Sequence, residues 1–334
     1  MAKPIGLALW GTEPIRTTIE HVRQAEAAGF ESVWLVDSQL ICRELHVTLA
    51  AAAMATTRIR LATGVTVPRI RHASVTASAL ATLDELSSGR AMAGVSLGHS
   101  ALRNIGEKPA RIAELRDYVR DVRDLLAGRE VRFESGTEGA LRWMPRPAAV
   151  PLHVAATGPK LTAAAAGMAD GVILLQGAAP DLLAAGIDRV EAGLAAAGRT
   201  RTEIEITAWI YVGLDDDAAA ARDQVRARVA AVLRMMDPAR FEGADREAVE
   251  RLRRAYDMFA HADSTPAHAA LAPDHLIDRF AVAGAPDAVR ARIQDILADP
   301  RIDRVVVSPQ IGGPDLPITA EFIRRFGQSV LAQI

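Results

Sequence analysis

Short, continuous apolar segments that alternate with amphipathic ones are the feature that most constrains how this chain can fold. About eight apolar segments occur, at residues 5–10, 32–36, 59–64, 91–98, 152–157, 171–177, 203–213 and 303–309. They lack the polar alternation of a half-exposed strand, so we expect both faces of each strand to be buried. Parallel sheets that are covered by helices bury their strands in this way. Eight such units favour an α/β fold of the closed (β/α)8 type, a TIM barrel, over an open doubly wound sheet.

The segments between these strands have the spacing of helices. Ile15, Ile19 and Val22 recur at the intervals of one helix face, and Gly29 follows where a C-cap glycine is expected. Helices are predicted over residues 14–29, 45–56, 73–89, 111–128, 160–169, 180–198 and 285–299. Residues 128–150 and 233–281 depart from the repeat, but the barrel pattern resumes after each. We therefore predict one domain, residues 1–334, with these two stretches as insertions.

Size and charge narrow the class of protein. A chain of 334 residues is long enough for one large α/β barrel, and a net charge of -2 gives no general attraction to nucleic acid or anionic membranes. Cys42 is the single cysteine, which suits a reducing compartment. No apolar run reaches the roughly 18 residues that span a bilayer, and the first residues lack the features of a signal peptide. We expect a cytoplasmic protein whose partner is a small molecule.

The residues that follow each strand are the ones to inspect, because barrel active sites lie at the carboxyl ends of the strands. Asp37 follows the second strand, where a carboxylate either binds a ligand or caps the next turn. Gly64 interrupts the third strand, which permits close approach to a flat ligand or marks a simple bulge. Gly98, His99 and Ser100 follow the fourth strand and supply flexibility and hydrogen-bond donors, although a lone histidine is often structural.

The end of the fifth strand is a candidate phosphate site. Thr157 and Gly158 precede Pro159, a residue suited to the first turn of a helix. The free N–H groups of that helix start favour a phosphate, and Lys160 could add to its binding. The start of a helix would also account for this pattern without any ligand.

Other kinds of site are not supported. The eight histidines are scattered without metal-ligand spacing, and no GxSxG elbow occurs, so we predict no metal site and no hydrolytic triad. Trp209 and Tyr211, on the seventh strand, are expected to pack in the core. The loop residues together suit a flat cofactor that carries a phosphate.

At these residues the sequence resembles the bacterial luciferase-like superfamily, and within it the deazaflavin-dependent oxidoreductases typified by methylenetetrahydromethanopterin reductase. Similar phrases lie at residues 26–38, 61–100 ("LATGVTVPRIRHASVTASALATLDELSSGRAMAGVSLGHS"), 103–128, 155–174 and 282–293. The resemblance implies a barrel, often a homodimer, with the cofactor's tricyclic ring against the ends of strands two to four. It also implies a non-prolyl cis peptide in a bulge of the third strand, which by position falls at Gly64–Val65. His72 matches a common family position and is expected to pack or to cap the next helix.

Residue by residue, the resemblance implies cofactor contacts from every loop inspected above. The residues concerned are Asp37, Thr63, Gly64, Val65, Gly98, His99, Ser100, Thr157, Gly158 and Pro159. Asp37 and His99 are the candidate catalytic residues. The chain has Asp37-Ser38 where many deazaflavin members have Asp-His, so the substrate class and the general acid stay open.

The leading hypothesis is an oxidoreductase that transfers a hydride between coenzyme F420 and a small organic substrate. The first alternative is a two-component monooxygenase that uses reduced FMN supplied by a flavin reductase. The second is a barrel without catalytic activity, which binds a flavin or has a structural role.

Overall fold

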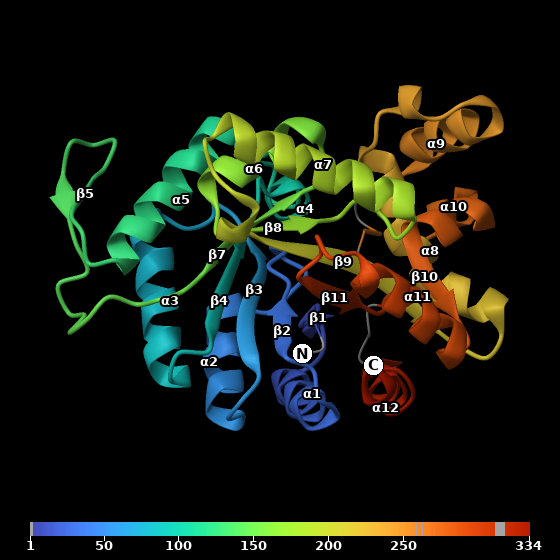
Figure 1. Cartoon of the computed structure of the whole chain (residues 1–334), viewed down its shortest axis with the longest axis horizontal. Coiled ribbons are helices and arrows are strands. Elements are labelled where there is room, and N and C mark those ends of the chain that lie inside the picture. Colours follow the sequence, from blue (N-terminus) through green and yellow to red (C-terminus); the bar gives the residue numbers. More distant parts are fainter. Residues whose placement is uncertain (1–2, 258–259, 262, 311–317) are drawn as a thin grey trace.

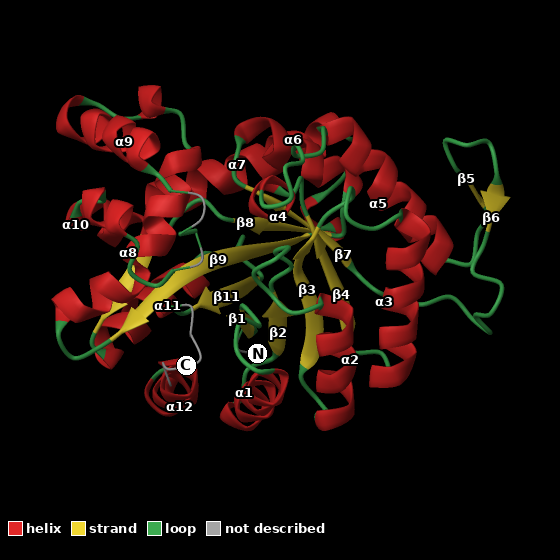
Figure 2. Cartoon of the chain, turned by 180° about the vertical axis from the view of Figure 1, so that it is seen from behind, coloured by secondary structure: helices red, strands yellow, loops and turns green. Residues whose placement is uncertain are grey.

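The eight apolar segments form a closed barrel of parallel strands with helices around it (Figures 1 and 2). The computed structural model describes residues 3–257, 260–261, 263–310 and 318–334. The barrel strands are β1 (Ile5–Leu9), β2 (Ser32–Leu35), β3 (Arg60–Thr66), β4 (Ala91–Val95), β7 (Leu152–Ala156), β8 (Gly171–Leu174), β9 (Glu205–Leu214) and β11 (Arg304–Ser308). Each pairs in parallel with the next, and β11 pairs with β1 to close the ring. The predicted TIM barrel is confirmed.

The predicted helices are confirmed, with ends that differ by at most two residues. They are α1 (Ile15–Ala28), α2 (Leu45–Ala55), α3 (Ala73–Ser87), α5 (Ile112–Leu126), α6 (Pro159–Met168), α7 (Pro180–Ala196) and α11 (Pro286–Ala298). The further helices are α4 (His99–Arg103), α8 (Ala218–Met235), α9 (Gly243–Ala255), α10 (Asp274–Phe280) and α12 (Ile318–Ser329). Gly29 ends α1 with a left-handed φ of 96°, as its position predicts, because glycine adopts that conformation without steric cost.

One strand of the sheet was not predicted. β10 (Ala281–Gly284) pairs in parallel with the outer half of β9, beyond the point where β9 leaves the ring. Its sequence, AVAG, is short and contains little of the β-branched and aromatic character that marks a strand, so the sequence carries only a weak signal.

The two stretches that depart from the repeat lie on different sides of the barrel. Residues 128–150 contain the short antiparallel pair β5 (Val131–Arg132) and β6 (Glu138–Gly139), which Figures 1 and 2 show away from the ring. Residues 233–281 contain the end of α8 and helices α9 and α10; residues 258–259 and 262 of this stretch lie outside the described residues. Their interpretation as insertions in a single domain stays a prediction.

The core has an inner and an outer layer. Inside the ring, a small cluster formed by Trp34, Met92, Trp209 and four smaller residues fills the barrel. Outside it, the aliphatic residues of the strands pack against the surrounding helices. A separate cluster joins α8, α9 and α10. The barrel is therefore a filled core, and a ligand can be bound only at its rim.

Candidate active site

A large cavity opens at the carboxyl ends of the barrel strands. It has a volume of about 1130 Å³, including its open mouth. Most of its wall is apolar, with a few polar side chains from the strand ends and from α8. Of the ten residues predicted to bind a cofactor, seven line it: Asp37, Gly64, Val65, Gly98, His99, Ser100 and Thr157. The tertiary structure thus brings most of the predicted loop residues together around one space.

A second cavity, of about 860 Å³, lies at the amino-terminal end of α6 and contains the other predicted turn residues, Gly158 and Pro159. The two cavities share four lining residues: Thr157, Leu175, Val232 and Met235. We therefore regard them as one cleft with an apolar part over the barrel and a polar end at α6.

The polar end is suited to an anion. Gly158 is the N-cap of α6, where no side chain caps the helix, and Pro159 occupies the first turn. A Cβ atom at Gly158 would meet no atom within 4 Å, so the backbone there is open to a ligand. Arg189 and Arg240 line the same cavity, and neither has an ion-pair partner in the described part of the chain. Free N–H groups at a helix start and two arginines together favour a phosphate.

The wall beside β3 contains the bulge that the resemblance implied. The register of β3 against β4 shifts between Thr63 and Thr66, and the peptide bond between Gly64 and Val65 is cis, as expected. A Cβ atom at Gly64 would lie 2.9 Å from the Cβ atom of Trp34, so only glycine fits. Thr63 lies behind this wall and does not line the cavity, because its hydroxyl is bound to the backbone of Gly94.

Asp37 is held by its neighbours. Its carboxylate accepts hydrogen bonds from Arg71 Nη1 at 2.8 Å, Thr66 Oγ1 at 2.9 Å and Gln39 Nε2 at 2.9 Å. Arg71 also pairs with Glu44, so this arginine lies between two carboxylates. The carboxylate of Asp37 is thus fixed at the edge of the cavity by three hydrogen bonds, one of them from a charged group.

The other basic residues of the β3–α3 loop have structural roles. Arg69 pairs with Glu114 on α5 at 2.9 Å. His72 is the N-cap of α3, accepts a hydrogen bond from the N–H of Ser74, and packs on Phe133. The expected packing and capping role of His72 is confirmed.

His99 begins α4 at the rim of the cavity. Gly98 before it has a φ of 82°, and a Cβ atom there would lie 2.9 Å from side-chain atoms of Val67 and Leu102. Burial lowers the pKa of His99, and the charges of Arg103 and Arg234 lower it further. The neutral imidazole is therefore the favoured form, which can accept a proton or a hydrogen bond at neutral pH.

Residues 233–281 were expected to form the outer wall of the cavity, but sequence reasoning did not identify which residues line it. Trp10, at the end of β1, and Arg228, Arg234 and His261 line it. Trp209 and Tyr211 line it as well, so their side chains form part of the site in addition to packing. One signal was available for Arg228: it lies between Val225 and Val232 on the buried face of α8, where an arginine is unexpected.

Cys42 lies apart from these residues. Burial raises the pKa of its thiol to about 12, and Cys42 lines neither cavity. An inert thiol is the interpretation that fits.

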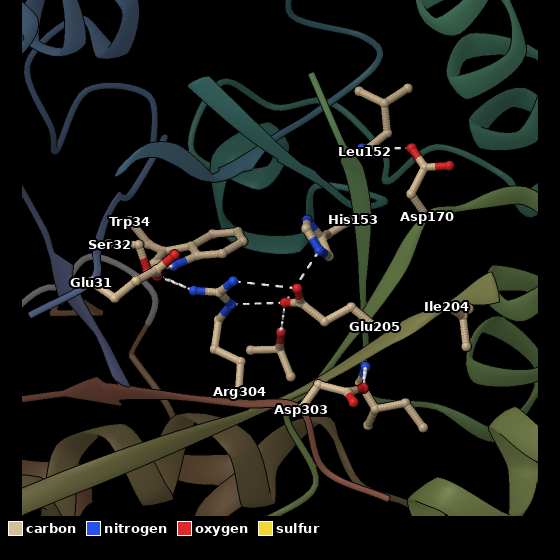
Figure 3. Close-up of polar contacts among 12 residues, drawn as sticks. Glu31, Ser32, Trp34, Leu152, His153, Asp170, Ile204, Glu205, Asp303 and Arg304 are labelled. Atoms are coloured by element: carbon tan, nitrogen blue, oxygen red, sulfur yellow. Dashed lines mark hydrogen bonds and ion pairs between the residues drawn. The ribbon is translucent and has the colours of Figure 1, made fainter. Parts of the chain in front are cut away.

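A second polar cluster lies at the opposite, amino-terminal end of the barrel (Figure 3). Arg304, 3 % exposed, pairs with Glu205 at 2.7 Å and with Glu31. His153 Nε2 lies 3.5 Å from the Glu205 carboxylate. Burial by itself raises the pKa of Glu205, but hydrogen bonds from His153 and Arg304 outweigh it and the pKa is lowered. These four residues form a network of paired charges and hydrogen bonds, which we call the amino-end cluster.

Two kinds of feature are not found in the described part of the chain. No group of three or more histidine, cysteine, aspartate or glutamate side chains there could hold a metal ion. No helix in the same ranges is long and apolar enough to cross a membrane.

Comparison with known proteins gives consistent results. Residues 4–304 match the luciferase-like monooxygenase family. The chain is 30% identical to a 5,10-methylenetetrahydromethanopterin reductase of Archaeoglobus fulgidus, over 94% of both chains. It is 33% identical to an F420-dependent glucose-6-phosphate dehydrogenase of Kineococcus radiotolerans, over 61% of this chain and 65% of that relative. The structure of the coenzyme F420-dependent tetrahydromethanopterin reductase of Methanopyrus kandleri superposes with a TM-score of 0.84, at 25% identity, over 100% of this chain and 99% of that one.

Proposed function

The chain belongs to the luciferase-like monooxygenase family, and on that premise we propose that it is an oxidoreductase that uses coenzyme F420. The observation that carries the proposal is the two-part cleft, which has an apolar space over the barrel and an anion-binding end at α6. Relatives whose names include F420 support a deazaflavin in particular. Bound in the cleft, the deazaflavin would supply the hydride-transferring carbon.

The residues of the cleft fit such a cofactor. The backbone around Gly64 and Val65 offers a smooth wall against which a flat ring can lie, because no side chain can project from residue 64. Gly98 and Ser100 border the same space. At the other end, the free N–H groups after Gly158, together with Arg189 and Arg240, would hold a phosphate.

Two residues are assigned roles in the reaction. His99, neutral and at the rim, would accept or return the proton that accompanies hydride transfer, with Ser100 beside it. Asp37 would bind at the ring edge while holding Arg71. Replacing Asp37 by Asn should reduce turnover more than thermal stability, since Arg71 keeps Glu44 as a partner. Unchanged turnover in D37N would remove Asp37 from the site.

The protein is proposed to act as a homodimer in the cytoplasm. Helix α2 exposes Val47 (65 %) and Met54 (74 %), and α3 exposes Val75 (54 %), a concentration of apolar side chains that a second copy could cover. Sedimentation of the wild-type protein and of Met54→Glu tests this: we expect a dimer that the charge weakens. A monomeric wild-type protein would contradict it.

Titration of the purified protein with F420 and, separately, with FMN tests the cofactor assignment, with absorbance and fluorescence as readouts. We expect F420 to bind and FMN to bind more weakly. Preferential binding of FMN, with oxygen consumption when a flavin reductase supplies reduced FMN, would favour the monooxygenase instead. Binding of neither cofactor would leave a barrel without this chemistry.

A further inference from the structure

Arg228 is a buried positive charge that pairs with no carboxylate of the described residues. Its side chain points from the middle of α8 into the cavity, and the residue is 3 % exposed. In the described part of the chain no carboxylate lies within ion-pair distance of it. Burial lowers its pKa, and the more distant Asp263 only opposes that shift. Burying an unpaired charge is costly, so such charges in proteins usually have a partner.

Among the described residues, Arg228 makes few contacts for a group with so many donors. One nitrogen donates to the backbone carbonyl of His261, and the guanidinium lies 4.9 Å from the centre of the Trp10 ring. A guanidinium has five N–H donors, and an aromatic face stabilises the cation without using them. The remaining donors are available to a group in the cavity.

A second arginine reinforces this region. Arg234, at the end of α8, lines the same cavity with its guanidinium 4.6 Å from the centre of the Tyr256 ring, and its Nε atom has no hydrogen-bond partner among the described residues. Burial and the charges of Arg228 and Arg234 lower the pKa of His261 to about 3, so this imidazole is neutral and adds no competing charge. The outer wall therefore carries two arginines that no described carboxylate pairs with.

Arg228 is on the far side of the cleft from the phosphate end. In the ring of eight strands, β1 and β7 are four positions apart, so their ends face each other across the barrel. Trp10 follows β1, whereas Thr157 and Gly158 follow β7. A cofactor tail that is anchored at Gly158 leaves Arg228 to the other ligand of the site.

We propose that Arg228 and Arg234 form an anion-binding subsite for the substrate, which is therefore an organic acid with an apolar body and one carboxylate or phosphate group. The proposal rests on the proposed function in that the second ligand of the cleft is taken to be the substrate. The anionic group would pair with Arg228, and the apolar body would lie over Val65 and Trp209 toward the reacting face.

Calorimetric titration of the cofactor-free protein with three matched probes tests the subsite: benzoate, phenyl phosphate and benzyl alcohol. We expect one or both anions to bind at least about tenfold more tightly than the neutral alcohol, since a charge-assisted hydrogen bond has about that effect. The anion that binds more tightly identifies the acidic group. Equal affinity for all three probes, or no binding up to millimolar concentration, would overturn the proposal.

Substitutions of single arginines show where in the cleft the anionic probes bind. Arg228→Met should lose the anion preference without any fall in melting temperature, whereas Arg222→Met, a change of the same kind on the outer face of α8, should keep it. Arg189→Met should lower affinity for F420 and leave benzoate binding unchanged. If Arg228→Met does not fold, Arg228→Lys, which keeps the charge, serves in its place and should retain weakened anion binding. Anion binding that is unaffected by substitution at residue 228 would contradict the subsite.

The two proposals fail separately. A protein that binds the anions at Arg228 but not F420 would refute the cofactor assignment alone. One that binds F420 but shows no anion preference would refute the subsite alone.

Discussion

Arg304 and Arg228 are equally buried, each 3 % exposed, but they lie at opposite ends of the barrel in opposite electrostatic surroundings. Arg304, in the amino-end cluster, pairs with Glu205 and Glu31. Arg228, at the carboxyl end, has no carboxylate within ion-pair distance among the described residues. Arg304 is thus paired within the folded protein, whereas Arg228 is the charge to which we assign a ligand. It agrees with the general division of barrels into a stabilising amino end and a functional carboxyl end.

The largest expected effect is a difference in stability between two variants, each of which lacks one of these arginines. Arg304→Met would leave Glu205 and Glu31 facing each other without a cation, and should lower the free energy of unfolding by about 3–5 kcal/mol. Arg228→Met should leave it nearly unchanged or raise it, because no carboxylate of the described residues is left unpaired and only the carbonyl of His261 loses a hydrogen bond. Urea unfolding monitored by circular dichroism measures both. Equal losses in the two variants would break the distinction between the two ends.

Substitution of one glycine at each end of the barrel compares the two ends without changing any charge. A Cβ atom at Gly171 would lie 1.8 Å from the ring of His153, so Gly171→Ala must displace a member of the amino-end cluster and should cost about 1–3 kcal/mol of stability. Gly158→Ala meets no atom within 4 Å and should change stability by less than about 0.5 kcal/mol. It should nevertheless weaken F420 binding, because the methyl group enters the cleft. Thermal unfolding and cofactor titration give the two readouts, and a destabilised G158A would contradict the prediction.

Groups at the two ends of the barrel should also lower the stability of the protein in different ranges of acid pH. Burial, the first cause in each case, lowers the pKa of His46, His99, His261 and His268. Below about pH 6.5 these histidines become protonated in the unfolded chain but stay neutral in the folded protein, so the free energy of unfolding decreases. The decrease is up to about 1.4 kcal/mol per pH unit for each histidine. The lowered pKa of Glu205 acts later, since the unfolded carboxyl takes up its proton only below about 4.5.

His261→Asn tests this order. It should reduce the slope of unfolding free energy against pH between about 6.5 and 3, the range in which the unfolded imidazole is protonated and the folded one is not, and leave the loss due to Glu205 below pH 4.5 in place. The asparagine can still bond to Tyr256, whose hydroxyl lies 2.6 Å from His261 Nδ1. An unchanged slope in H261N would show that His261 does not contribute.

Much of the cleft could be predicted from local sequence, but the individual residues of its outer wall could not. Gly64, Gly98 and Gly158 were recognised because each follows or interrupts an apolar strand, and parallel strands carry their ends to one rim. The wall made by α8 depends on how residues 218–235 pack over the barrel, which the helical repeat does not determine. The same repeat places Arg228 on the buried face but does not say what lies opposite.

By itself, the sequence determined the closed ring, because eight continuously apolar segments between amphipathic helices can bury both faces only in a covered parallel sheet. It also determined the turn at Gly158, since the start of a helix carries its free N–H groups wherever it is placed. Only the tertiary structure decided which buried arginine is paired with carboxylates. Glu31 meets Arg304 across 273 residues, whereas Arg228 meets an aromatic ring and a carbonyl, and no local pattern records such long-range pairings.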